Sequence, residues 1–211
     1  MPPIPKLFTL CYFAPISWYT SAVIEGEHFL EHWDTFQKQT YRNRCEIYSP
    51  NGPMSLVIPV VHDKNKKNLY RDTRMDDRQK WRQVHRKSIE TAYSNSPFFP
   101  YFEDDLRSLY ESEEENLFAF NLKCHEWVEQ LIQKKLTLQP TDEWVVDFEG
   151  LDLRERIHPK KESPLENPDE YHQTFRYKLG FFPDLSILDV VFNLGMESHS
   201  YLVNNRSKLK L

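Results

Sequence analysis

Three cationic side chains between residues 38 and 44 are the first candidates for a binding site. The segment reads Lys38, Gln39, Thr40, Tyr41, Arg42, Asn43 and Arg44. In a β-strand, alternate side chains point to one side, so Lys38, Arg42 and Arg44 would share a face. Arginine's planar fork makes two-pronged contacts with phosphate or carboxylate. The segment therefore predicts an anion site, with Asn43 among its binding residues, for a nucleotide-sugar diphosphate or a carboxylate. The alternative is a solvated outer face of a sheet.

His85 is the first candidate for proton transfer, because the unperturbed pKa of histidine lies close to physiological pH. Trp81 and Ile89 lie one helical turn away on either side, on a face expected to meet the core. The alternative for His85 is therefore a satisfied, partly buried side chain. Trp81 is assigned as a binding residue that stacks on a sugar, with simple packing as its alternative.

Asp189 is a second candidate catalytic residue, and Asn193 one turn further is assigned to binding. Ser186 and Asp189 also have the spacing of a capping box, in which the acidic side chain reaches back to a backbone N–H. That structural role is the alternative for Asp189.

Two further patterns suggest chemistry but have simpler explanations. His28, Glu31 and His32 fit the H-x-x-E-H pattern of one class of zinc protease. That pattern needs a helix, and a strand would hold the histidines too far apart, so no metal ligand is assigned. Cys45 follows Arg44, whose charge favours a thiolate. Strand alternation turns Cys45 away, which favours a small buried side chain.

Composition and missing motifs exclude several classes of function. The net charge of -5 argues against a nucleic-acid partner, which needs a basic surface. No glycine-rich phosphate loop, GxSxG turn or dinucleotide fingerprint occurs, which argues against P-loop ATP hydrolysis and hydride transfer. The sequence identifies no cofactor. The odd number of cysteines, 3, with no CxxC pair, indicates free thiols in a reducing compartment.

The elements that must position these residues follow from periodicity and turn signals. Strands are predicted at residues 7–13, 41–48, 54–61, 68–73 and 143–148, and helices at 16–24, 81–93, 99–110, 116–135 and 186–195. Asn51 and Gly52 predict a hairpin turn between the second and third strands. The fold class is mixed α/β (α+β): a small mixed or antiparallel sheet from the N-terminal half packs with a helical middle and a C-terminal helix. Residues 171–182 remain ambiguous between helix and strand.

Residues 1–211 are predicted to form a single domain, with a helical subdomain at 76–136 as an alternative. Residues 151–169 hold many charges and are predicted to be a long surface loop that closes over a site as a lid. Residues 1–6 lack the basic and apolar regions of a secretory signal, and no apolar stretch is long enough to span a bilayer. A cytoplasmic location is therefore expected.

Three sequence blocks resemble the WbqC-like protein family. The first is Tyr12-Phe13-Ala14-Pro15 with Trp18-Tyr19, where many family members have His-Gln-Pro nearby and this chain has Leu10-Cys11-Tyr12. The second runs from residues 36–44 through Ile58-Pro59-Val60, Trp81 and His85 to Pro97-Phe98-Phe99. The third covers residues 180–189 and 192–195.

The resemblance implies a part in the biosynthesis of O-antigen and related surface polysaccharides. We expect a transferase that moves an acyl or aminoacyl unit to an amino sugar or nucleotide-sugar, its small-molecule ligand. Alternatives are a non-catalytic accessory or scaffold protein that binds glycan-assembly enzymes and, more weakly, a metal-dependent hydrolase. A homo-oligomer is left open.

Overall fold

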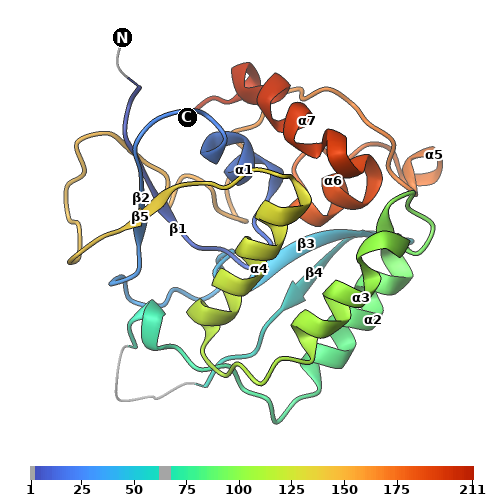
Figure 1. The fold of residues 1–211 in the computed structure, drawn as a ribbon, viewed down its shortest axis with the longest axis horizontal. Helices are drawn as coiled ribbons and strands as arrows, with labels where there is room; N and C mark the ends of the chain where they lie inside the picture. The colour runs from blue at the N-terminus through green and yellow to red at the C-terminus, as the bar shows by residue number, and fades with distance from the viewer. Residues whose placement is uncertain (1–2, 62–67) are drawn as a thin grey trace.

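A computed structural model describes residues 3–61 and 68–211. Residues 1 and 2 of the segment that was predicted not to be a secretory signal lie outside the described residues. The mixed α/β prediction is confirmed (Figure 1). A four-stranded parallel sheet has the order β5-β2-β1-β6. Its strands are β1 (Lys6–Thr9), β2 (His28–Glu31), β5 (Leu138–Pro140) and β6 (Leu151–Asp152). Helix α1 (Ile16–Ala22) connects β1 to β2, as parallel neighbours require a crossover.

A separate antiparallel hairpin consists of β3 (Arg44–Ser49) and β4 (Gly52–Val57). The hairpin prediction is confirmed, although β3 begins three residues later than predicted and β4 ends four residues earlier. Pro50 and Asn51 form the two-residue turn, and Gly52 has φ +108, a backbone conformation that favours glycine.

The predicted helices in the middle and near the C-terminus are present. They are α2 (Trp81–Tyr93), α3 (Phe99–Tyr110), α4 (Leu117–Leu131) and α6 (Ile187–Leu194). Helix α7 (Ser198–Asn204), which was not predicted, follows α6. Side chains cap two of them: Asn116 accepts from the Ala119 N–H at α4, and Ser186 accepts from the Leu188 N–H at α6. Residues 171–182 contain only the short helix α5 (Arg176–Leu179).

Two strand predictions are wrong. Residues 68–73 form the 3-10 turn η1 (Tyr70–Asp72), and residues 143–148 contain no strand. The real strands β5 and β6 have three and two residues, too few for a detectable alternation. These two strands are defined instead by their parallel pairing: β6 pairs with β1, and β5 pairs with β2.

One aromatic-rich core draws side chains from the N-terminal segment, the middle helices and the C-terminal helices alike. Helix α2 packs against α3 and β3, whereas α1 packs against α6 and α7. The parallel sheet and the α2–α3 pair lie toward opposite sides of the molecule in Figure 1. In the described part of the chain, no helix combines the length and the apolar character needed to cross a bilayer.

Candidate functional site

Charged residues gather at the carboxyl edge of the parallel sheet. Glu31 ends β2 and Asp152 ends β6, and parallel strands bring these ends to the same edge. In open α/β sheets, ligands bind outside this edge, where the strand order reverses. Here β2 and β6 flank β1 on opposite sides, so the reversal lies between β1 and β6. The residues that follow these strands are therefore the first place to look for a site.

Arg154, just beyond β6, is buried with all its nitrogens engaged. Its Nε and Nη2 donate to the Asp152 carboxylate at 3.0 and 2.6 Å. Its Nη1 donates to the Val145 carbonyl at 2.8 Å and lies 3.4 Å from Glu31 Oε2. Glu31 is fully buried and also accepts from the Trp33 N–H and the Thr141 hydroxyl. This closed network ties three segments of the edge together.

Arg42 lies at the same edge but is only partly satisfied. Its side chain is 1% exposed, and its Nη2 donates to Asp34 Oδ2 at 2.5 Å. Its Nε and Nη1 are buried and have no hydrogen-bond partner. Glu155 Oε1 lies 3.6 Å from Nη2, beyond normal hydrogen-bond distance. A buried donor without an acceptor costs about 1–3 kcal/mol, so an incoming acceptor would be favoured here.

The charge of Arg42 acts to lower the pKa of two neighbours, against the effect of burial. Burial raises the pKa of Asp34, while Arg42 partly offsets the rise. Burial also raises the pKa of the Cys11 thiol to about 12, although Arg42 acts to lower it. Cys11 is therefore a neutral thiol at physiological pH, and the guanidinium and the carboxylates carry the charge of this region.

A small cavity of about 180 Å³ lies next to the segment that holds Arg42, although Arg42 itself does not line it. It is lined by Tyr41, Glu46, Ile157, His158, Pro159, Lys161, Ser163, Pro164 and Asp184. Tyr41 directly precedes Arg42, and the charges of Glu155 and Arg42 both act on the His158 ring. One wall is thus the segment predicted to be a lid. The structure places that segment at the cavity.

Two groups in this cavity can move protons. Burial lowers the pKa of His158, so its ring is neutral and basic near pH 7. Burial raises the pKa of Asp184, whose carboxylate accepts from the Ser17 N–H at 2.8 Å and from the Ser163 hydroxyl. A base and a carboxyl group therefore face one space next to a buried cation, an arrangement suited to acid–base chemistry on an anionic ligand.

The structure changes how the residues of the predicted cationic face are understood. Residues 38–43 are turns and not a strand, so the prediction of a shared strand face is wrong. Lys38 is exposed, Arg42 is buried, and Arg44 is half-buried at the start of β3. Asn43 is buried and donates from Nδ2 to the Ile58 carbonyl at 2.7 Å, which fastens the turn to the chain beyond β4. Of this set, only Arg42 lies in the charged edge described above.

His85 lies in an aromatic cluster away from the residues that line the cavity. Its Nδ1 is 3.0 Å from the Tyr12 hydroxyl, which also bonds Tyr110. Burial lowers its pKa to about 4, so the ring is neutral at physiological pH. Trp81 packs edge-on against it and donates from Nε1 to Asp77 at 2.7 Å. The catalytic role of His85 and the sugar-stacking role of Trp81 stay predictions.

Asp189 makes a third, separate group. Its Oδ2 accepts from the Tyr171 hydroxyl and, at 2.7 Å, from Gln173 Nε2. The Ser186 N–H instead donates to the Glu46 carbonyl, so only the serine half of the expected capping box is formed. Burial raises the pKa of Asp189 to about 6. Asn193 donates to the Asp189 carbonyl at 2.7 Å and so belongs to this group.

The zinc-like motif does not have the required geometry. His28 and Glu31 are in the strand β2, and His28 Nε2 lies 2.7 Å from the Ile24 carbonyl. His32 Nε2 lies 3.1 Å from the Thr141 carbonyl, while Glu31 belongs to the Arg154 network. Within residues 3–61 and 68–211, no three or more His, Cys, Asp or Glu side chains converge as a metal site. The pKa of the Cys45 thiol is raised well above its ordinary value by burial, which disfavours a nucleophilic thiolate.

Most residues of the charged edge were not predicted from the sequence. These are Asp34, Asp152, Arg154, Glu155 and Asp184. A usable signal was the run Asp152-Leu153-Arg154-Glu155, in which charged residues flank a leucine inside a long polar segment. Glu31 was considered only as part of a metal motif.

The fold and the edge together define a mixed α/β protein with a buried, incompletely bonded arginine at the carboxyl end of a small parallel sheet. The family model of the WbqC-like protein family matches residues 11–159, which include Arg42, Arg154 and His158. The chain belongs to this family. No curated protein and no solved structure matches it.

Proposed function

We propose that the protein is a group transferase that binds an anionic sugar and attaches an acyl or aminoacyl unit to it. The ligand is an amino sugar or a nucleotide-linked sugar, and the context is the assembly of surface polysaccharide in the cytoplasm. The observation that carries the proposal is buried Arg42 at the carboxyl edge of the sheet: two of its nitrogens lack acceptors, and the preceding residue, Tyr41, lines a cavity. Family membership supports the glycan context.

In this reaction, the acceptor amine or hydroxyl attacks the acyl carbon of the donor. A new C–N or C–O bond forms, the bond to the donor's leaving group breaks, and the acceptor's proton passes by way of a base to that leaving group. His158 replaces His85 as the first candidate for this base, because it lines the cavity. Arg42 holds the anionic part of the sugar, and Asp184 orients the acceptor.

Calorimetric titration with UDP-glucose, glucose 1-phosphate and glucuronate tests the binding half of the proposal. At least one of these ligands should bind the parent protein, and Arg42→Lys should weaken that binding at least about tenfold. Arg74→Ala is the control, because Arg74 is 67% exposed and pairs only with exposed Glu115. Absence of binding to every ligand, or equal binding to the Arg42 variant, would remove the site.

Mass spectrometry tests the transfer half. The protein is incubated with glucosamine or UDP-glucosamine and an acyl or aminoacyl thioester. The sugar should gain the mass of the acyl unit, and His158→Gln should slow this gain while leaving sugar binding in place. If no donor in such a panel modifies the sugar, the transferase half of the proposal is removed and only sugar binding remains.

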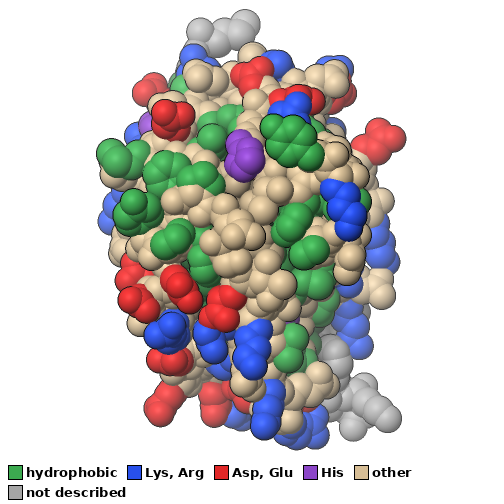
Figure 2. Space-filling model, turned by 90° about the vertical axis from the view of Figure 1, so that its right-hand side faces the viewer, with side chains coloured by type: hydrophobic (Ala, Val, Ile, Leu, Met, Phe, Trp, Pro, Cys, Tyr) green, Lys and Arg blue, Asp and Glu red, His purple; other side chains and the backbone are tan. Residues whose placement is uncertain are grey.

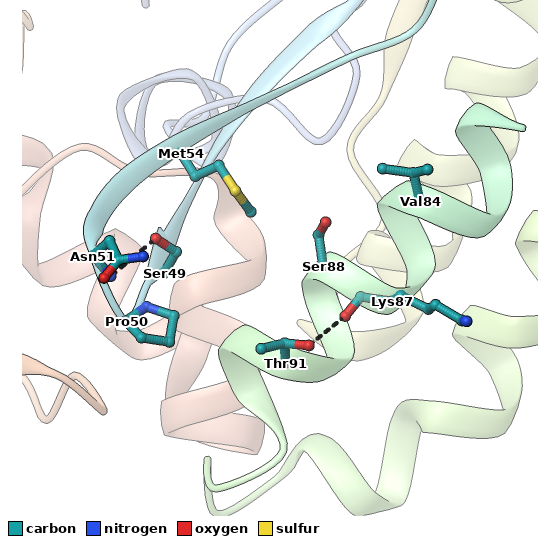
Figure 3. A pocket seen from close by; sticks show the side chains of 8 residues that line it. All are labelled: Ser49, Pro50, Asn51, Met54, Val84, Lys87, Ser88 and Thr91. Atoms are coloured by element: carbon teal, nitrogen blue, oxygen red, sulfur yellow. Dashed lines mark hydrogen bonds between the residues drawn. The ribbon is translucent and has the colours of Figure 1, made fainter. Parts of the chain in front are cut away.

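One observation favours an accessory protein as the second candidate. An open groove of about 450 Å³ lies between the β3–β4 hairpin and α2. Figure 3 shows Met54 from the hairpin and Val84 from α2 pointing into it, while Lys87 points away. Val84 is 57% exposed, and Figure 2 shows small groups of hydrophobic side chains across this face. Exposed apolar surface of this kind suits a protein partner.

Co-expression with a glycosyltransferase encoded by a neighbouring gene tests this candidate. Val84→Glu should abolish co-purification of the two proteins, whereas Val146→Glu, which changes another exposed valine, should not. Co-purification that both variants retain would eliminate the groove as the contact.

A further inference from the structure

We propose that the anionic group recognised by Arg42 is a carboxylate, and that the side chain of Glu155 stands in its place in the ligand-free protein. This inference rests on the proposed function, since it names the class of ligand for the same site. It chooses between the two kinds of anion, diphosphate and carboxylate, that an arginine site could bind.

The number of charges around Arg42 favours a single negative charge. Asp34 and Glu155 both approach its guanidinium. The second buried arginine of this edge is already bonded to Asp152 and Glu31. A phosphate or diphosphate would bring two or more negative charges to an arginine that already has two carboxylates nearby. A sugar carboxylate brings one.

The guanidinium also has the donors that a carboxylate needs. Nη1 has no partner, and Nη2 uses one N–H for Asp34 and retains another. These two nitrogens share the outer end of the guanidinium, so they can present parallel N–H groups to two oxygens of a planar carboxylate. Asp34, bonded through one oxygen, holds the guanidinium in place without blocking Nη1.

Glu155 has the properties of a displaceable occupant. Its Oε1 is buried and has no hydrogen-bond partner, although it lies 3.6 Å from Arg42 Nη2. Its side chain is 46% exposed, against 1% for Arg42, so it can turn into solvent while Arg42 stays in place. Exchange of Glu155 for a ligand carboxylate keeps the charge next to Arg42 constant and gives both nitrogens an acceptor. A phosphate would not keep that charge constant.

Glu155 therefore competes with the ligand, and removing its charge should tighten binding. Glu155→Gln is expected to bind glucuronate about tenfold more tightly than the parent. The control is Glu166→Gln, because the Glu166 side chain is equally exposed, at 46%, and pairs with Lys210 instead. That variant should bind like the parent.

The experiment titrates glucuronate and glucose 1-phosphate into the parent and the Glu155→Gln, Glu166→Gln and Arg42→Lys variants by calorimetry. We expect glucuronate to bind the parent at least about tenfold more tightly than glucose 1-phosphate. In Arg42→Lys, the two ligands should bind equally. Thermal unfolding of each variant verifies that it is folded, and Glu155→Gln changes a half-exposed side chain, so the test does not depend on Arg42→Lys.

The outcomes separate the two proposals. If glucose 1-phosphate binds as tightly as glucuronate, or more tightly, and Arg42→Lys weakens it, the anion site stands and the carboxylate inference falls. Unchanged or weaker glucuronate binding in Glu155→Gln would also overturn the inference. If no anionic sugar binds any variant, the proposed function falls with it.

Discussion

Arg42 and Arg154 are two buried arginines at one edge of one sheet, yet they differ in how completely they are bonded. Arg154 has an acceptor for each of its nitrogens, whereas Arg42 uses only Nη2. Both side chains are almost equally inaccessible, at 8% and 1%. Burial alone therefore does not distinguish an arginine with a purely structural role from one that can bind a ligand. The number of N–H donors without an acceptor does distinguish them.

The local sequence explains part of the difference. Asp152 is two residues from Arg154, so a short turn after β6 brings its carboxylate to the guanidinium. Arg42 has its bonded partner on the segment after β2 and its second carboxylate on the segment after β6. Neither carboxylate near Arg42 is therefore close to it in sequence in the way that Asp152 is close to Arg154.

Loss of Arg154 should have the largest effect on stability. Arg154→Ala leaves buried Glu31 without its cation, and breaking a buried ion pair in this way costs about 3–5 kcal/mol. Urea denaturation of the variant measures the loss in the free energy of unfolding. The control is Arg78→Ala, whose side chain is 85% exposed. An equally small loss for both variants would mean that the network around Arg154 is not structural.

Asp189 is a buried carboxylate whose hydrogen-bond partners are neutral donors, so its contribution to stability should depend on pH. Its pKa is raised from 3.8 to about 6 by burial, so the folded state binds a proton more tightly than the unfolded state. Its contribution to stability is complete below about pH 4 and is lost as the pH rises through about 6. From the size of the shift, this loss is about 3 kcal/mol.

Asp189→Asn should abolish that loss. The stability of the variant relative to the parent, from urea denaturation at pH 4, 5, 6 and 7, should improve by about 2 kcal/mol across the range. Asp169→Asn, which changes a carboxylate that is 60% exposed, is the control. A constant difference between Asp189→Asn and the parent would show that Asp189 is ionised in the fold throughout.

Removal of the whole Arg42–Asp34 pair should cost less than about 2 kcal/mol. In Arg42→Met/Asp34→Asn, both charges disappear together, and the two unsatisfied nitrogens of Arg42 leave with them. The matched double variant Arg154→Met/Glu31→Gln should lose clearly more stability, because Glu31 accepts several bonds from the edge. Equal losses for the two double variants in urea denaturation would erase the distinction between the arginines.

The smallest effect is expected at the surface. Arg74→Ala removes an ion pair in which both partners are more than half exposed, and such pairs contribute about 0–1 kcal/mol. Any loss measured by urea denaturation should shrink further in 1 M salt, because salt screens exposed charges. A loss as large as that of Arg154→Ala would mean that exposure is a poor guide to the energetics of arginines in this protein.

Local patterns predicted the helices better than the site. Residues 99–110 were predicted as a helix and form α3 with the same bounds, and Asn51-Gly52 correctly marked the hairpin turn. These features depend on residues that are close in sequence. Arg42 was also among the predicted anion ligands, but the expected strand face that selected it does not exist.

The rest of the site could not be predicted because parallel pairing creates it. Arg154 and Glu31 meet only when β6 and β2 take places on either side of β1, and β6 has two residues. A strand that short has no periodicity, and nothing near Glu31 in the sequence indicates that a distant arginine will neutralise it. His158 was predicted only as part of a lid loop, and its place near Arg42 depends on the same pairing.

The position of β1 also has a consequence for synthesis on the ribosome. Its register places Lys6 beside Leu151, so one edge of this strand stays unpaired until most of the chain has emerged. During that interval the nascent chain exposes an unpaired strand edge and a glutamate without its neutralising cation, both hazards for aggregation. Chaperone binding to partly translated chains should therefore persist until the arginine after β6 leaves the exit tunnel.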